Sequence, residues 1–312
     1  MRGIKEGKRL FKTRKSKNMK RVYLTLLFTG FIIYVYSQDK FIDRFTVRQS
    51  FQSKNDRAEP ALFTFAKPKD KDQSWLLNAA IGYNLLKKSN SVLTIDPYFQ
   101  VNKNTLIDKI QNNWQAGVSS EWQCRDMSKR NWSPIIIAAI KYNEDISKQI
   151  TSFQGSIYFT PLFKGKAKRP KYFWIPNNTS DFGNVIQFTY SPYLGFENEN
   201  RLKTESESSL GAIYRAVFRV TSIISLFPKS DQLKGKFEFN FDWQFRNNIS
   251  ESVDDLTKSD HKYFTTSFNY TFFNADDGKK SAKIGIDFTN GENPAKNFEQ
   301  QSFYSISLKV KL

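Results

Sequence analysis

Cysteine and histidine are nearly missing from this chain of 312 residues, which contains only Cys124 and His261 of these two types. A single cysteine cannot form an internal disulfide, and a metal site built from several cysteines is excluded. A single histidine removes most arrangements in which histidine acts beside a nucleophile or a metal. The sequence therefore predicts no enzyme, no metal and no cofactor. The fold must be held by a large core or by a closed hydrogen-bonded sheet.

Long apolar runs are also scarce, and the one that stands out lies near the N-terminus. Val22–Val35 follows a basic pair of residues, and Val35 and Ser37 occupy the −3 and −1 positions of a signal-peptidase cleavage site. The run is shorter than the ~20 apolar residues of a typical spanning helix. We therefore predict that residues 1–37 are a cleaved signal peptide that exports the chain through the inner membrane. An uncleaved inner-membrane anchor is the alternative.

Three segments flank or follow this run. Residues 1–18 form a basic tract that either extends the signal peptide or precedes the true start at Met19. Residues 38–60 are a polar N-terminal leader with weak alternation of apolar side chains. A periplasmic leader, a short extra strand and a plug are all open interpretations of it. Residues 61–312 are expected to form one β-barrel domain.

Acidic residues are the minority among the charged residues, since the chain has 48 lysines and arginines but 30 acidic residues. Residues 1–37 hold ten of the basic residues and one of the acidic residues, so the remainder carries 38 − 29 = +9. This moderate excess is typical of solubility and of contact with lipid headgroups. Nucleic acid is not expected as a partner.

Helical periodicity is absent after the apolar run, and period-two alternation takes its place. Lys236–Arg246 reads KFEFNFDWQFR, with aromatic side chains on one parity and polar side chains on the other. Successive side chains of a strand point to opposite faces, so this stretch is a ribbon with one apolar face. Its length suits a tilted strand that crosses a bilayer in ~9–11 residues.

Twelve such stretches follow one another in the chain. They are Ala61–Pro68, Trp75–Leu86, Val92–Val101, Gln111–Cys124, Trp132–Tyr142, Thr151–Thr160, Val185–Glu197, Leu210–Ser222, Lys236–Arg246, Lys262–Phe273, Ala282–Thr289 and Ser302–Leu312. In Trp132–Tyr142 the run Ile135–Ile137 blurs the parity, so the facing of that strand stays open. Pro161–Asn184 is too long for a turn, and it is interpreted as another short strand or an in-folded flap.

An even number of alternating strands joined in sequence predicts an all-β fold, an antiparallel up-and-down transmembrane β-barrel of about 12 strands. Closure of such a barrel pairs every backbone group, as lipid requires. A soluble β-sandwich shows similar alternation with its apolar face inward, so it stays as an alternative.

The last strand adds a feature of its own, since it alternates up to the final residue. One face carries Tyr304, Ile306, Leu308, Val310 and Leu312. A signal peptide combined with such a terminal strand resembles the outer-membrane β-barrel proteins of Gram-negative bacteria. The cleavage site before Gln38 and the segment Thr289–Pro294 are similar to porin-like barrels of the Bacteroidetes group. That class usually ends on an aromatic residue, whereas this chain ends on leucine.

The resemblance implies that residues 61–312 lie in the outer membrane, in contact with its lipid. It also implies that the barrel-assembly machinery of that class reads the terminal strand. Outer-membrane phospholipases, a twelve-stranded class, pair a serine with a histidine close in sequence. His261 has no serine two residues later, so this pairing is not supported. The acidic turn Asn274–Gly278 lacks the spaced carboxylates of a calcium loop.

If lipid covers the apolar faces, the polar faces line an interior. The charged candidates for this inner wall are Arg215, Arg219, Glu238, Asp242, Arg246, Lys283, Asp287, Lys309 and Lys311. Lumen charges tune what passes through a pore, so the first prediction is a small passive pore for polar or anionic solutes.

Two other functions stay open. Opposite charges on neighbouring strands, such as Arg219 and Asp242, neutralise one another as cross-strand pairs. A barrel filled by such pairs would be closed, and it would serve as a structural or assembly platform for an envelope protein. The third possibility is a secreted β-sandwich that binds carbohydrate through its tryptophans.

Overall fold

The computed structural model describes ten stretches of the chain: residues 44–51, 59–66, 74–86, 92–105, 110–165, 168–205, 209–253, 259–275, 280–294 and 298–311. The expected signal peptide and the first residues of the leader lie outside these stretches, as does Leu312. The chain divides into two compact units, Met1–Phe45 and Thr46–Leu312. The second unit contains almost all of the described residues.

Strands make up almost all of the regular structure. One short 3-10 helix, η2 (Pro170–Tyr172), accompanies them in the described part of the chain. The strands are β1 (Phe45–Arg48), β2 (Ala61–Ala66), β3 (Ser74–Tyr83), β4 (Leu93–Asn104), β5 (Gln111–Gln123), β6 (Trp132–Asp145), β7 (Ile150–Phe163), β8 (Ser180–Phe182), β9 (Ile186–Lys203), β10 (Gly211–Leu226), β11 (Phe237–Glu251), β12 (Asp260–Ala275), β13 (Lys280–Asn293) and β14 (Glu299–Lys311). Within the described stretches, no helix has the length and hydropathy needed to span a membrane.

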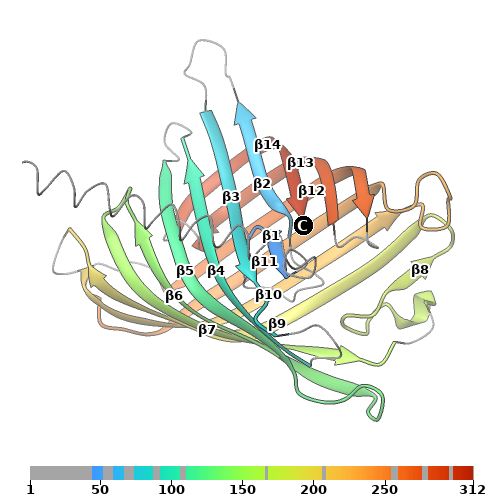
Figure 1. The fold of residues 1–312 in the computed structure, drawn as a ribbon, viewed down its shortest axis with the longest axis horizontal. Helices are drawn as coiled ribbons and strands as arrows, with labels where there is room; N and C mark the ends of the chain where they lie inside the picture. The colour runs from blue at the N-terminus through green and yellow to red at the C-terminus, as the bar shows by residue number, and fades with distance from the viewer. Residues whose placement is uncertain are drawn as a thin grey trace, which may run out of the picture. The chain divides into compact units, whose positions relative to one another are not determined.

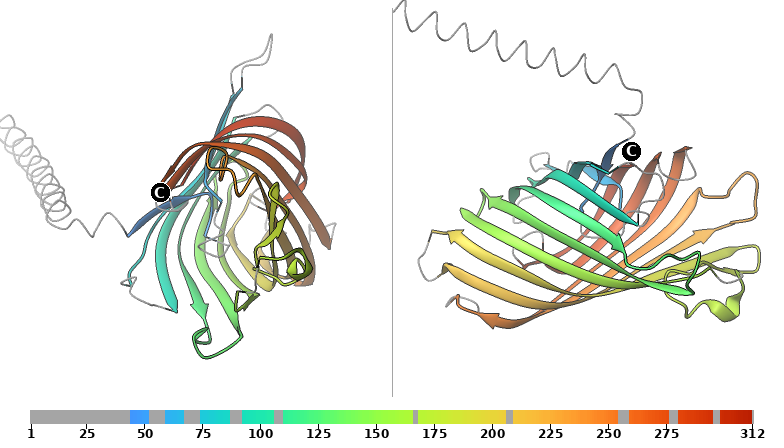
Figure 2. Two further views of the ribbon diagram at one scale, coloured as in Figure 1. Left: turned by 90° about the vertical axis from the view of Figure 1, so that its right-hand side faces the viewer. Right: turned by 60° about the horizontal axis from the view of Figure 1, so that its bottom comes forward.

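Twelve strands form a closed antiparallel barrel (Figure 1). Strands β2 to β7 and β9 to β14 pair with their neighbours in order, and β7 pairs directly with β9. The ring closes where β14 pairs with β2, from Ser307 opposite Thr64 to Val310 opposite Ala61. Figure 2 shows the strands curving round to meet one another. The prediction of a twelve-stranded antiparallel barrel is therefore confirmed, and each of the twelve predicted stretches corresponds to one barrel strand.

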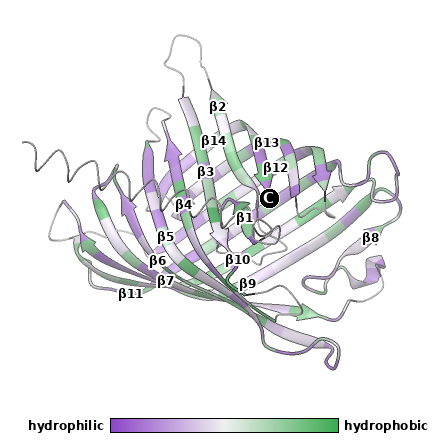
Figure 3. Cartoon of the chain, in the orientation of Figure 1, coloured by the Kyte–Doolittle hydropathy of each residue, from purple (hydrophilic) through white to green (hydrophobic). Residues whose placement is uncertain are grey.

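The two faces of the barrel differ in chemistry, and Figure 3 shows apolar and polar residues alternating along the strands. On β11, Asp242, Gln244 and Arg246 are buried, whereas Trp243 between them is exposed on the outside. Large apolar side chains are exposed in the same way on most barrel strands, among them Phe99, Ile140, Leu194, Phe218 and Ile286. An apolar surface of this extent is unfavourable in water. It suits the hydrocarbon core of a bilayer, and it is the reverse of a soluble sandwich, whose apolar face is buried.

The structure shows which residues of β6 face inward, a question that the sequence left open. Ile135 and Ile137 are buried at 1% and 2% exposure, whereas Ile140 is 55% exposed on the outside. The two buried isoleucines pack inside the barrel in a cluster completed by Tyr158, Tyr193 and Val217. The parity was blurred in the sequence because β6 has apolar residues on both faces. One section of the inner wall is therefore packed with large, mostly apolar side chains.

The long connection between β7 and β9 contains η2 and β8 but adds no strand to the barrel. β8 pairs only with the first residues of β9, with Ser180 opposite Phe188. Asn177 fastens the connection to the barrel: its Nδ2 donates to Thr160 Oγ1 at 3.0 Å, and Ser191 Oγ donates to its Oδ1 at 2.6 Å. Thr160 and Ser191 are both buried. The short-strand interpretation of Pro161–Asn184 is thus the one seen, and the strand count stands.

Candidate functional site

Part of the leader reaches the interior of the barrel, at Phe51 and Glu59. After β1, which pairs with β3, the backbone N–H of Gln49 donates to the carbonyl of Glu59 at 2.8 Å. Between these two residues, Phe51 is 1% exposed, and its ring stacks on Tyr98 with a centroid distance of 4.7 Å. The barrel wall makes room for this ring at Gly82, where an added Cβ would lie 2.1 Å from Phe51 Cζ. Residues 52–58 lie outside the described stretches.

Phe51 has two further contacts that hold it to the wall. The Arg48 guanidinium lies 3.5 Å from the centroid of its ring, a cation–π distance. The hydroxyl of Ser119 on β5 donates to its carbonyl at 3.0 Å. Ring stacking, a cation and a hydrogen bond therefore fix one point of the leader against the inner wall of β3 to β5.

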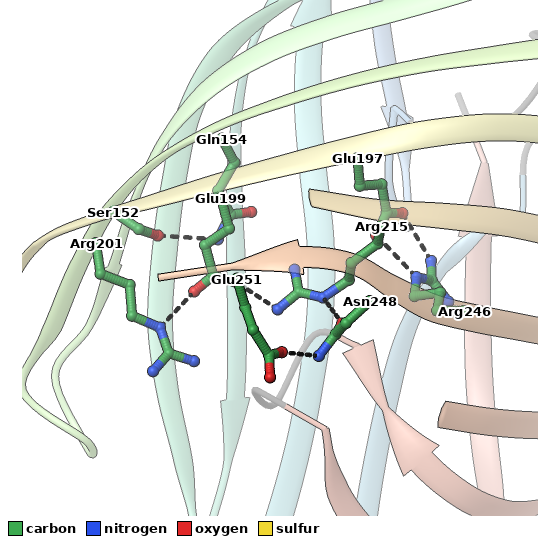
Figure 4. Close-up of polar contacts among 9 residues, drawn as sticks. All are labelled: Ser152, Gln154, Glu197, Glu199, Arg201, Arg215, Arg246, Asn248 and Glu251. Carbon is green, nitrogen blue, oxygen red and sulfur yellow. Dashed lines mark hydrogen bonds and ion pairs between the residues drawn. The ribbon is translucent and has the colours of Figure 1, made fainter. Parts of the chain in front are cut away.

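Figure 4 shows a network of acidic and basic side chains on β9, β10 and β11. Glu199 accepts from Arg215 Nη2 at 2.9 Å and from Arg201 Nε at 3.0 Å. Glu197 accepts from Arg246 through two nitrogens, Nε at 2.8 Å and Nη2 at 2.9 Å. All four oxygens of the two carboxylates are therefore occupied by arginines.

A second ion pair lies next to this network. Arg219 donates to both carboxylate oxygens of Asp242, from Nε at 2.9 Å and from Nη2 at 2.7 Å. In the strand register Arg219 lies opposite Gln244, so the pair is diagonal and spans two residues along β11. Glu59 approaches the same guanidinium, with 3.9 Å between its Oε1 and Arg219 Nη2. The leader thus reaches the charged wall at this point.

A third group of charges lies on the strands near the closure of the barrel. Lys309 on β14 donates to Asp287 Oδ1 at 2.6 Å and to Asn269 Oδ1 at 2.8 Å. Lys283 on β13 forms an ion pair with Glu238 on β11. These contacts join side chains of four consecutive strands. Each lysine of the group again faces a carboxylate.

The nine charged candidates from the sequence share the buried parity of their strands. Eight of them are members of these ion pairs: Arg215, Arg219, Glu238, Asp242, Arg246, Lys283, Asp287 and Lys309. Lys311 lies half-buried, opposite the buried Ser281. The structure brings the eight together with acidic and basic partners, which cancels most of their charge.

Alternation in the sequence did not identify several charged residues of the inner wall. Glu197 is the last residue of the predicted stretch Val185–Glu197 and follows the parity of Thr189 and Ser191, so alternation could have found it. Glu199 would have followed if the strand had been extended past residue 197. Lys141 was hidden because the apolar run earlier in β6 obscured its parity. Glu59 carried no signal, because its position depends on how the leader folds into the barrel.

Mostly polar residues line two cavities in the interior. The residues that line both are Gln49, Glu59, Asn78, Asp242, Tyr263, Thr265 and Asn293. The cavities therefore meet where Glu59 approaches the Arg219–Asp242 pair. On the opposite wall, β4 and β5 contribute the uncharged amides Gln100, Asn102 and Gln115 to the larger cavity.

The single histidine, His261, lies in the described part of β12. His261 lies 4.1 Å from the ring centroid of Phe298, and its Nδ1 is 2.8 Å from Glu292 Oε2. Within the described stretches, no three side chains of histidine, cysteine, aspartate or glutamate gather as a metal site would require. The charged and amide walls of the larger cavity offer hydrogen-bond donors and acceptors to polar groups.

The terminal strand closes the barrel and presents its apolar face outward. Tyr304 and Ile306 are the most exposed of its members, at 78% and 67%, and Leu308 is 42% exposed. Val310 is half-buried. A closed strand ring with an apolar exterior and a polar interior is the architecture of an integral β-barrel membrane protein.

Comparison with known proteins gives a likeness in structure only. No family model matches the chain, and no curated protein matches it. One similar solved structure belongs to work on the in-meso crystallization of membrane proteins; it is 8% identical, with a TM-score of 0.39, over 81% of this chain and 82% of that one. Another is OccK11 (OpdR) of Pseudomonas aeruginosa, which is 10% identical, with a TM-score of 0.33, over 86% of this chain and 63% of that one.

Proposed function

We propose that the chain is an outer-membrane β-barrel of a Gram-negative bacterium, of the Bacteroidetes type, that passes small polar solutes. The observation that carries the proposal is the pair of polar cavities, which share seven lining residues and so follow one another through the interior. A barrel of twelve strands lies between the filled bore of ~8 strands and the open channel of ~16 strands. Glu59 and Asp242 line both cavities, so the passage would run past them.

The charge pattern argues for small polar solutes as a class. Arg215, Arg219 and Arg246 each hold a carboxylate, and Arg201 shares Glu199 with Arg215, so the β9–β11 wall offers hydrogen-bonding groups whose charges largely cancel. Solutes that carry hydroxyl, amide or carboxylate groups can exchange water for these groups on the way. A permeant solute of this kind needs no catalytic step, and the proposal assigns none.

Conductance in planar bilayers tests the proposal. We expect small, regular current steps after insertion of the purified barrel, and swelling of liposomes in glycerol or other small polyols. Insertion is checked separately by a shift of the folded band on heating in detergent. Barrels that insert but give neither current nor swelling would overturn the pore.

A second candidate is a closed barrel that acts as a platform for an envelope partner. It is favoured by the same ion pairs and by Phe51, which fill part of the bore. The connection between β7 and β9 would be its working surface, because it projects the exposed rings of Phe173 and Trp174. This function predicts no conductance and a protein that co-purifies only while that connection is intact.

A further inference from the structure

Lys141 differs from the other basic side chains that line the larger cavity. It lies on the inner parity of β6, between the buried residues Ala139 and Asn143. Its Nζ donates to Gln115 Oε1 at 3.0 Å, and the acceptor is a neutral amide. Among the described residues, no carboxylate lies within ion-pair distance of its ammonium group.

The arginines that line the same cavity form ion pairs with carboxylates. Arg215 holds Glu199, Arg219 holds Asp242 and Arg246 holds Glu197. Glu197, Glu199 and Asp242 therefore already form direct ion pairs with guanidinium groups. The larger cavity thus contains matched pairs, Glu59 beside the Arg219–Asp242 pair, and one lysine whose hydrogen-bond partner is a neutral amide.

The neighbours of Lys141 fix its position without neutralising it. Gln115 accepts from the ammonium through Oε1 and donates through Nε2 to Asn143 Oδ1 at 3.0 Å. This chain orients the amide, so its oxygen faces the lysine. An ammonium group has three donors, and two of them are left for a molecule in the cavity. Gln154 lies opposite Lys141 in the strand register and lines the same cavity.

We infer that Lys141, together with Gln115 and Gln154, binds the oxyanion group of a small solute, a carboxylate or a phosphate. A cation without a direct ion-pair partner, held between low-dielectric walls, attracts anions more strongly than the same charge in open water. Lysine acts as a point charge toward such groups. The inference deepens the proposed passage and rests on it for its biological role, but the binding itself is measurable in a barrel that conducts nothing.

Calorimetry on the folded full-length chain in detergent tests the site, with succinate and inorganic phosphate as the two probes. Loss of a charged hydrogen-bond partner typically weakens binding by about tenfold or more, so Lys141→Gln should bind the preferred probe at least that much more weakly. Lys141→Arg should retain most of the affinity. Tighter binding of one probe than the other identifies the group as carboxylate or phosphate.

The matched control is Lys129→Gln, which removes the same charge from an exposed turn. It should bind as the wild type does, and an equal loss in both glutamine variants would overturn the site, because binding would then follow net charge. If Lys141→Gln does not fold, the wild type decides instead: a bound probe should protect Lys141 from chemical acetylation. A conducting barrel that binds neither probe would overturn this site alone, whereas a barrel that binds but does not conduct would overturn only the passage.

Discussion

Arg219 and Asp242 meet as a two-pronged ion pair inside the barrel, with both carboxylate oxygens accepting from the guanidinium at 2.9 and 2.7 Å. The pair joins β10 to β11 at the point where the two interior cavities meet. Such paired geometry is among the stronger hydrogen-bonded ion pairs in proteins. Its burial makes the loss of one partner costly, because the other charge is left without compensation.

The first prediction concerns this pair. Arg219→Gln should lower the free energy of unfolding by roughly 3 kcal/mol, since one buried charge is left alone. The double variant with Asp242→Asn should recover much of that loss, because neither charge then remains. Urea unfolding in lipid vesicles measures both. Losses that simply add in the double variant would mean that the two side chains do not interact.

The second prediction concerns the place that Phe51 occupies. Gly82→Val should drive the Phe51 ring away from Tyr98, because even a Cβ at this glycine would lie 2.1 Å from Phe51 Cζ. Arg48, which is 4% exposed and lies over that ring, should then become accessible. Trypsin should cut after Arg48 in this variant but not in the wild type.

The control for this change is Gly155→Val, where an added Cβ meets nothing within 4 Å. It should leave the cleavage pattern unchanged, as read by mass spectrometry of the fragments. Resistance at Arg48 in the Gly82→Val barrel would show that Phe51 does not depend on the space at this glycine.

The third prediction distinguishes lipid from water outside the barrel. Ile140, near the middle of β6, is 55% exposed, and Ile146, in the turn after β6, is 50% exposed. Ile140→Lys should lower the free energy of unfolding in vesicles by about 2–4 kcal/mol, the range for a lysine near the bilayer midplane. Ile146→Lys should leave the free energy of unfolding almost unchanged, because a turn lies near or beyond the headgroups. Equal and negligible costs at both positions would mean that water covers the outer face.

The fourth prediction is a pH effect in the turn between β5 and β6. The backbone N–H of Ser128 donates to Asp126 Oδ1 at 2.8 Å, and this bond, helped by the serine hydroxyl, lowers the pKa of Asp126. Because the pKa is lower when folded, the bond stabilises the turn above the unfolded pKa. That contribution is lost as the pH falls through the folded value.

Titration of the Asp126 carboxyl by NMR measures this shift. Ser128→Ala removes the hydroxyl but keeps the N–H, so the pKa of Asp126 should rise only part of the way to its ordinary value. A wild-type pKa at the ordinary value for aspartate would contradict the hydrogen bond.

Alternation in the sequence was enough to determine the twelve strands, because a strand in lipid must turn apolar side chains outward at every second residue. The same rule placed Arg215, Asp242 and Lys309 on one wall, since parity depends only on local order. It failed on β6, where Ile135 and Ile137 face inward and gave no contrast with the outer face. That failure concealed Lys141.

Only the tertiary structure decided which charges meet. Arg219 and Asp242 were one possible cross-strand pair in the sequence, and the register of β10 and β11 decided that they meet and that they do so diagonally. Glu59 and Phe51 reach the interior because the leader folds into the closed ring, a contact between residues far apart in the chain. Periodicity is a local property and could be inferred from the residues alone. Pairing depends on register and closure, so it emerged only when all twelve strands were assembled.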